Sequence, residues 1–108
     1  MRTEIPPGTL YMLILKSLAR LGPMHGYGIA VHVQQTTEEV LQVEEGSLYP
    51  ALQRMLVKGW VKAEWRQTEN KRRARYYTLT PAGRKRLEVE LHEFERVMAA
   101  IRRVIQPA

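Results

Sequence analysis

The spacing of apolar residues along the chain predicts four helices and one β-hairpin. Apolar positions recur every three or four residues over residues 9–21, in a stripe wide enough for two neighbouring elements. Gly22 and Pro23 end this first helix, because glycine tolerates a left-handed cap and proline resists helix continuation. A second helix is expected over residues 26–36. Its core positions are Ile29, Ala30 and Val33.

A third helix is predicted over residues 44–56, with one apolar face and one polar face. Leu48, Leu52, Met55 and Leu56 lie at i, i+4, i+7 and i+8 and turn toward the core. The residues left on the other side are Ser47, Tyr49, Pro50, Gln53 and Arg54. Proline lacks an amide hydrogen, which places it near the first turn, and the helix cap is either Ser47 or one of the acids Glu44 and Glu45.

After Gly59 the apolar period changes from helical to alternating, which predicts a β-hairpin over residues 61–79. The eight residues 67–74 form its connection, longer than a tight turn requires and typical of an extended wing. Residues 41–43 are expected to add an edge strand to this hairpin. Trp60 and Trp65 are expected to support the core and the wing. One of Tyr76 and Tyr77 is expected to pack inward, because neighbouring residues of a strand point to opposite faces.

The last helix begins with Thr80 as its N-cap and Pro81 in its first turn. Its apolar residues are spaced by 4, 3, 4, 3 and 4 positions, which is a heptad seam of about 27 Å at about 1.5 Å per residue. The seam consists of Leu87, Leu91, Phe94, Met98, Ile101 and Ile105. A small domain has little surface to cover a seam of this length, so self-association is favoured over folding back on the same domain.

The positive charge is concentrated in one segment of the chain. Of a net charge of +6, residues 62–86 contribute +7, from nine Lys and Arg against two Glu. The preceding residues sum to zero and the following ones to −1. Such a local field attracts polyanions, although a charged run can also be a merely solvated face. The cations around the hairpin tip are Lys71, Arg72, Arg73 and Arg75.

Other sequence features exclude several function classes. The chain contains no Cys, no apolar run of about 18 residues and no signal-peptide pattern, so we expect a single-domain cytoplasmic protein. His25, His32 and His92 lack metal-ligand spacing, and His25 is better explained as a turn or cap residue. The acids of the last helix form surface ion pairs rather than a catalytic set. We therefore expect no metal, no cofactor and no catalytic residue.

A presented helix followed by a basic hairpin tip is the arrangement with which winged-helix proteins bind double-stranded DNA. The predicted fold class is mostly α with a small β-hairpin, a winged helix-turn-helix plus a C-terminal dimerisation helix. Residues 1–80 form the DNA-binding domain and residues 81–108 the dimerisation helix.

Three ordered motifs in this chain resemble the signatures of the PadR family of transcriptional regulators, over about residues 10–91. They are Gly22-Pro23-Met24-His25-Gly26-Tyr27, then Gly46-Ser47-Leu48-Tyr49-Pro50-Ala51-Leu52, then Arg75-Tyr76-Tyr77-Thr78-Leu79-Thr80-Pro81-Ala82-Gly83. The resemblance is to the short subgroup with one C-terminal helix. It implies a homodimeric winged helix-turn-helix protein, usually a repressor, with the third helix in the major groove.

By the same resemblance, Ser47, Tyr49, Pro50 and Arg54 would meet the operator, and the wing arginines would meet phosphate or the minor groove. Gln53 lies on the same exposed side of the helix and joins this set. Some family members bind aromatic effectors at the dimer interface, often with a tryptophan of the last helix; here Phe94 is the sole aromatic residue of that helix. Two other roles stay open: a winged-helix module that binds an acidic protein, and a ligand sensor at the dimer interface. Arg54 is expected beside Tyr49 and Pro50 on the same side as the wing, which argues against the first of these roles.

Overall fold

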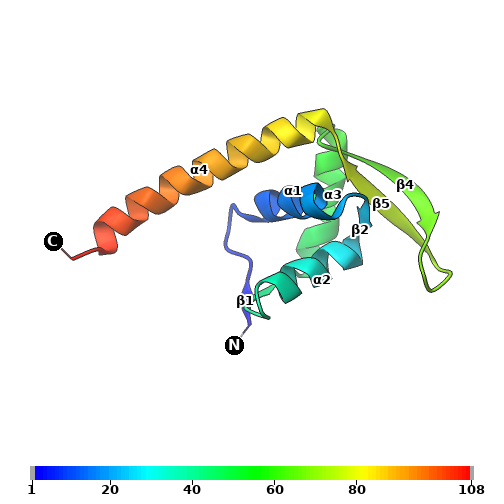
Figure 1. The fold of residues 1–108 in the computed structure, drawn as a ribbon, viewed down its shortest axis with the longest axis horizontal. Helices are drawn as coiled ribbons and strands as arrows, with labels where there is room; N and C mark the ends of the chain where they lie inside the picture. Colours follow the sequence, from blue (N-terminus) through cyan, green and yellow to red (C-terminus); the bar gives the residue numbers. More distant parts are fainter. Residues whose placement is uncertain (1, 108) are drawn as a thin grey trace.

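A computed structural model describes residues 2–107 as a mostly α fold with a small β wing (Figure 1), which confirms the expected fold class. Three helices form a bundle, the wing projects from one end, and the last helix runs away on the other side. The elements in chain order are β1 (Thr3–Glu4), α1 (Leu10–Leu21), β2 (Met24–His25), α2 (Gly26–Thr36), β3 (Leu41–Gln42), α3 (Glu45–Val57), β4 (Val61–Gln67), β5 (Arg73–Leu79) and α4 (Pro81–Ile105).

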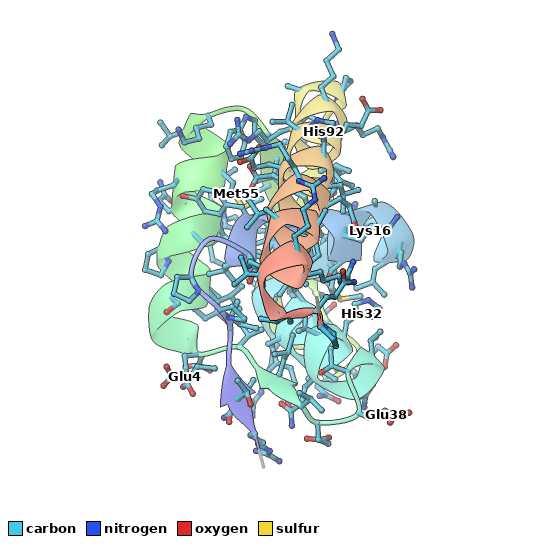
Figure 2. All side chains as sticks on the ribbon, turned by 90° about the vertical axis from the view of Figure 1, so that its left-hand side faces the viewer. Glu4, Lys16, His32, Glu38, Met55 and His92 are labelled. Carbon is cyan, nitrogen blue, oxygen red and sulfur yellow. The ribbon has the colours of Figure 1, made fainter. Side chains whose placement is uncertain are left out.

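The core lies where α1, α2 and α3 meet and is closed by the base of the wing and the start of α4. Leu15, Ile29 and Leu52 come from the three helices and are fully buried. Tyr77 of β5 packs into the same cluster, so the inward member of the tyrosine pair is Tyr77, while Tyr76 is half-buried. Figure 2 shows Met55 of α3 pointing into the bundle behind α4.

The predicted helix ends are confirmed by their caps. Gly22 follows α1 with a φ of 77°, a left-handed conformation that glycine adopts without strain. The amide of Gly28 donates to Nδ1 of His25 at 2.9 Å, so His25 caps α2. The amide of Gly83 donates to Oγ1 of Thr80 at 3.0 Å, with proline in the first turn of α4 as expected.

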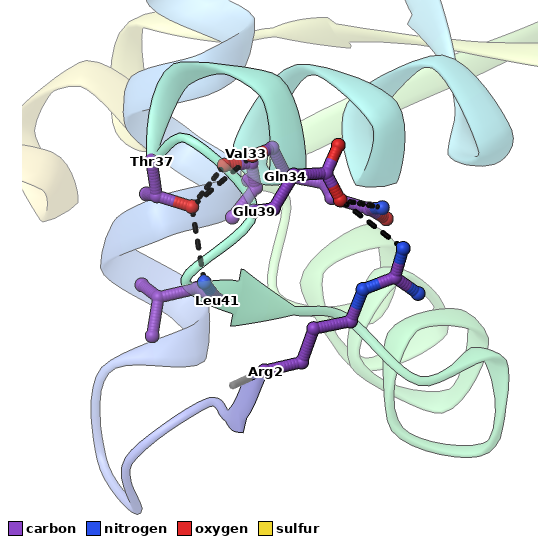
Figure 3. A network of polar contacts seen from close by, with 6 residues as sticks. All are labelled: Arg2, Val33, Gln34, Thr37, Glu39 and Leu41. Carbon is purple, nitrogen blue, oxygen red and sulfur yellow. Dashed lines mark hydrogen bonds and ion pairs between the residues drawn. The ribbon is translucent and has the colours of Figure 1, made fainter.

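The connection between α2 and α3 is held by a local polar network (Figure 3). Oγ1 of Thr37 donates to the carbonyl of Val33 at 2.9 Å and accepts from the amide of Leu41 at 3.1 Å. Glu39 bonds the Gln34 side chain and pairs with Arg2 at 3.3 Å. This network fixes the turn between the end of α2 and the start of β3.

The expectation that residues 41–43 form an edge strand of the hairpin is wrong. β3 instead pairs in parallel with β1, with Thr3 opposite Leu41. The third strand of the wing sheet is β2, where Met24 lies opposite Tyr77 and His25 opposite Tyr76. Strands of two residues carry no readable period, and their partners lie far away in the sequence, so pattern alone could not assign them.

The wing strands are longer, and their connection shorter, than predicted. β4 and β5 pair from Val61 opposite Leu79 to Gln67 opposite Arg73, so the connection is the five residues 68–72 rather than eight. The amide of Thr68 donates to the carbonyl of Arg72 at 2.7 Å, and Lys71 has a φ of 59°. Near the tip of the wing, polar residues occupy both faces of β4 and β5. The alternation of apolar and polar residues is therefore not visible there in the sequence.

Within residues 2–107, no helix combines the length and the apolar character needed to cross a bilayer. The same residues contain no group of three or more His, Cys, Asp or Glu placed to hold a metal ion.

Candidate nucleic-acid interface

The N-terminal part of α3 is exposed and carries acids at its first turn. Glu44 occupies the N-cap position without a side-chain cap bond, while Ser47 lies inside the helix, so the Ser47 cap alternative is wrong. Glu44 and Glu45 offset the positive end of the helix dipole, which disfavours a phosphate at this terminus. What α3 offers to an anionic partner is therefore its side chains and not its N-terminal amides.

Pro50 lies in the second turn of α3, not the first as predicted, since the helix begins at Glu45. Its missing amide hydrogen leaves the carbonyl of Gly46 without the usual i+4 donor. A Cβ added to Gly46 would meet no atom within 4 Å, so this strip of helix faces open solvent. The carbonyl is therefore open to solvent, and the strip without bulky side chains permits close approach by a partner.

The exposed surface of α3 has a centre and two flanks. Residues at i, i+4, i+7 and i+11 share one line on a helix, and that line holds Gly46, Pro50, Gln53 and Val57, all exposed. Val57, which is not among the residues predicted to contact DNA, is 80% exposed. Gln53 is the only polar side chain on the central line. Its amide is therefore the one side-chain group of this line that can both donate and accept hydrogen bonds.

Tyr49 and Arg54 lie on opposite flanks of α3, because five residues correspond to a rotation of about 140°. Tyr49 faces the wing, while Arg54 faces α1, where its Nε donates to the hydroxyl of Tyr11 at 2.5 Å. The expectation that Arg54 lies beside Tyr49 on the wing side is therefore wrong. Helical period orders residues around an axis, but only the neighbouring elements decide which flank faces what.

Tyr49 lines a groove between α3, the start of α2 and the wing. A Cβ on Gly26 would stand 2.7 Å from the Tyr49 ring, so a larger residue where α2 begins would displace that ring. Burial, together with Glu45 and Tyr77, raises the pKa of the Tyr49 phenol above its ordinary value of 10.0. The phenol therefore stays protonated at neutral pH and can donate a hydrogen bond.

The wing contributes arginines to the other wall of this groove, whose volume is about 400 Å³. Arg73 and Arg75 line it together with Trp65 and the exposed Tyr27. The guanidinium of Arg73 lies 5.2 Å from the centre of the Trp65 ring. Trp65 itself is 59% exposed, so it supports the wing but not the core. The prediction for Trp60 is confirmed, since it packs partly against the core.

The basic segment divides between two places in the structure. Lys71, Arg72, Arg73 and Arg75 are all exposed on the outer wing. Arg66 is paired with Glu64 on β4. Arg84, Lys85 and Arg86 belong to the first turns of α4, where Arg86 lies 4.8 Å from the centre of the Trp60 ring and pairs with Glu90 at 2.7 Å. The outer wing therefore carries only part of the +7 counted in the sequence.

The seam of α4 is divided as well. Leu87 is 7% exposed and belongs to the domain's own core, which leaves almost no surface for a partner, so its assignment to a dimer interface is wrong. Leu91 packs against the edge of that core. Farther along, Ile101 and Ile105 are exposed, as are Val97 and Val104, which widen the stripe and were not selected from the sequence. Val97 and Val104 lie beside the heptad positions, so the heptad spacing alone does not mark them.

Three helices pack together, the third of them has an exposed side, and a basic hairpin adjoins it. This arrangement defines a winged helix-turn-helix domain of the DNA-binding class. The family model described as the transcriptional regulator PadR-like family matches residues 14–89. The chain therefore belongs to the PadR-like family of transcriptional regulators.

Solved structures agree with this assignment. The fold is similar to that of a transcriptional regulator from Clostridium thermocellum, with a TM-score of 0.83 and 29% identity over 92% of this chain and 95% of that one. A PadR family transcription regulator from Clostridium difficile gives a TM-score of 0.73 and 27% identity, covering 91% of this chain and 99% of that one.

A curated relative is longer. A 37.1 kDa protein in a transposon of Streptomyces fradiae is 41% identical over 90 residues, which is 83% of this chain but only 24% of that protein. The chain therefore spans about a quarter of the length of this relative.

Proposed function

We propose that this protein is a sequence-selective transcriptional repressor that binds an inverted-repeat operator as a homodimer. The observation that carries the proposal is the shared groove of α3 and the wing. Tyr49 from α3 and Arg73 and Arg75 from the wing line one open cleft. A single DNA duplex lying on α3 would thus also meet the cations of the wing.

The proposal assigns different tasks to the two elements. Gln53, at the centre of the exposed line of α3, suits bidentate bonds to adenine, and Pro50 and Val57 suit apolar contact with thymine methyl groups. Ser47 and Tyr49 flank this line with hydroxyl donors. Lys71, Arg72, Arg73 and Arg75 suit phosphate oxygens, which give affinity and orientation rather than sequence choice.

The homodimer is proposed from the outer half of α4. Its exposed apolar side chains have no cover within residues 2–107, and a twofold-related copy of the same helix offers a self-complementary one. The seam of this proposal consists of the half-buried Leu91, Phe94 and Met98 and the exposed Ile101 and Ile105, and it is widened by the exposed Val97 and Val104. Two copies of α3 related by that axis would read half-sites about 10 bp apart, or a multiple of that distance.

A gel shift with the DNA upstream of the protein's own gene at moderate salt tests the proposal. We expect retention of one segment in excess nonspecific DNA, and footprinting should reveal a twofold repeat within it. Retention that is indifferent to sequence would support the alternative of a module for acidic partner proteins. A retained segment without a twofold repeat would contradict the proposal that a homodimer binds an inverted-repeat operator.

The salt dependence of binding tests the wing. Replacing Arg72 and Arg73 with Ala in both subunits removes four phosphate contacts, so the slope of log affinity against log salt should fall by about 3 to 4. The matched control is Lys16→Ala with Arg20→Ala, which removes the same charge from exposed positions of α1. Figure 2 shows Lys16 on the side of the molecule opposite α3. Equal salt slopes for the two double variants would mean that the wing arginines contact solvent and not DNA.

A further inference from the structure

Arg54 of α3 is held in place by a residue of α1. Its Nε donates to the hydroxyl of Tyr11 at 2.5 Å, across 43 positions of sequence. Its guanidinium carbon lies 5.6 Å from the centre of the Tyr11 ring. Among the described residues no carboxylate pairs with Arg54, although its side chain is exposed. Among the described residues, the hydroxyl of Tyr11 is therefore the one side-chain hydrogen-bond partner of this cation, and no carboxylate forms an ion pair with it.

Tyr11 is itself fixed by the packing of the domain. Its ring meets Trp60 edge to face, with the ring centres 5.6 Å apart and the planes at 81°. Lys58 and Arg86 lie 5.2 and 4.8 Å from the centre of the Trp60 ring. The amide of Trp60 donates to the carbonyl of Met55 at 3.0 Å, and the carbonyl of Trp60 accepts from the amide of Thr80 at 3.1 Å. The hydroxyl of Tyr11 is thus a rigid acceptor.

The bond to Tyr11 uses only one of the five N–H donors of arginine. The terminal amino groups stay free to bind a phosphate or a base edge with two donors. A free arginine loses rotamer freedom when it binds, and this loss weakens association. An arginine that is already held by Nε has less freedom to lose.

We propose that Tyr11 is a positioning residue for DNA recognition: its hydroxyl holds the guanidinium of Arg54 on the α1 flank of α3, with the terminal amino groups presented to DNA. The inference rests on the proposed function, because it requires that α3 meets DNA. It adds a residue of α1, outside the helix-turn-helix and the wing, to the recognition surface.

The change Tyr11→Phe removes the hydroxyl and keeps the ring on Trp60. Ordering one arginine side chain corresponds to about a 2- to 12-fold change in affinity per subunit. Two subunits on one operator multiply this factor, so we expect a loss of at least about fivefold for the dimer. The loss should require Arg54, and Tyr11→Phe should therefore have no effect in an Arg54→Ala background.

The experiment is a double-mutant cycle of wild type, Tyr11→Phe, Arg54→Ala and the double variant. The probe is a duplex that the wild type selects from a library with a randomised 30-bp centre, and the control is a scrambled duplex of the same composition. Exchange of the Arg54 Nε proton with water, followed by NMR of ¹⁵N-labelled protein, reads the proposed bond directly. Urea unfolding of each variant detects any structural damage.

The supporting result is faster Nε proton exchange in Tyr11→Phe, an unchanged unfolding midpoint, and an affinity loss on the selected duplex that vanishes in the Arg54→Ala background. An equal loss in both backgrounds would mean that the phenol contacts DNA itself, which overturns the positioning role. Unchanged affinity in Tyr11→Phe beside a clear loss in Arg54→Ala would also overturn it. A wild type that selects no duplex would instead refute the proposed function.

Discussion

The two halves of α4 share one sequence pattern and differ in what covers it. In the first half, Gly83 and Leu87 are buried against the domain. In the second half, Val104 is 83% exposed and Ile105 is 72% exposed, and the helix extends away from the bundle (Figure 1). The heptad spacing continues across this change without a break.

An apolar stripe therefore indicates that its side chains will be covered, but it does not indicate which surface covers them. Leu87 has its cover from the same chain, through Leu79 and the core between α1 and α3. Ile101 is 45% exposed and does not belong to that core, so its exposed part is left for another molecule to cover. Substitutions in the two halves should therefore act on different equilibria, the first on folding and the second on association.

The largest effect is expected for Met98→Glu in the outer half. A charge facing its own symmetry mate across the seam would be buried unpaired, at a cost of about 3 to 5 kcal/mol, so the dimer should dissociate. Sedimentation at micromolar concentration should give a folded monomer with weakened operator binding. The matched control is Ala99→Glu, which places the same charge on the opposite side of the helix and should leave the dimer intact. A wild type that sediments as a monomer would refute the comparison.

The next prediction pairs Leu87→Ala with Ile101→Ala. The first removes a side chain from the core and should lower the free energy of unfolding by about 2 to 5 kcal/mol at every protein concentration. The second should have little effect on the monomer and should shift the urea midpoint only where the dimer is populated. Urea titrations over a hundredfold range of protein concentration separate the two. Similar behaviour of both variants would contradict the division of α4.

A smaller effect is expected for Gly83→Ala in the first turn of α4. A Cβ there would overlap the carbonyl oxygen of Trp60 and lie 2.7 Å from Cδ1 of Leu79, and that carbonyl is already bonded to the amide of Thr80. Overpacking of this kind costs about 1 to 3 kcal/mol, against a helix-propensity gain of about 1 kcal/mol. The control Gly46→Ala, where the space is open, should stabilise the protein in the same thermal unfolding assay.

The smallest effect is expected for Glu93→Gln on the exposed side of the outer half. A hydrogen bond from Arg96, and its charge, lower the pKa of the Glu93 carboxyl below its ordinary value of 4.5. A lowered pKa in the folded state stabilises the protein above the ordinary value, and this contribution is lost as the pH falls through the folded value. Both residues are fully exposed, so the urea midpoints of wild type and variant should agree at pH 7. A large drop at pH 7 would mean that this pair is covered in the dimer.

Much of the fold could be predicted from the sequence. Periodicity located all four helices, with Gly22 and Thr80 marking ends that the structure confirms. The wing was found as well, although its connection was overestimated because the strands become polar on both faces beyond the core. The short strands β1, β2 and β3 were missed or misassigned, since two residues define neither a period nor a partner.

The candidate site was predicted as a set of exposed residues, and the structure divided that set. Ser47, Tyr49, Pro50, Gln53 and Arg54 are all exposed on α3, as the helical period requires. That Tyr49 turns toward the wing and Arg54 toward Tyr11 depends on where α1 and the hairpin pack. No local signal marks Tyr11, because its role arises from a contact across 43 residues.

The helices and the wing, the exposed side of α3, the positive charge of the wing and the resemblance to a family of transcriptional regulators could all be inferred from the amino-acid sequence alone. Each of these follows from local spacing, composition or motif, which are properties of neighbours in the chain. The three-dimensional packing was needed to show that Leu87 is buried in the core while Ile101 is exposed, and that Arg54 is held on the α1 flank. Those outcomes depend on which surfaces distant segments cover, because burial is a property of packing in three dimensions.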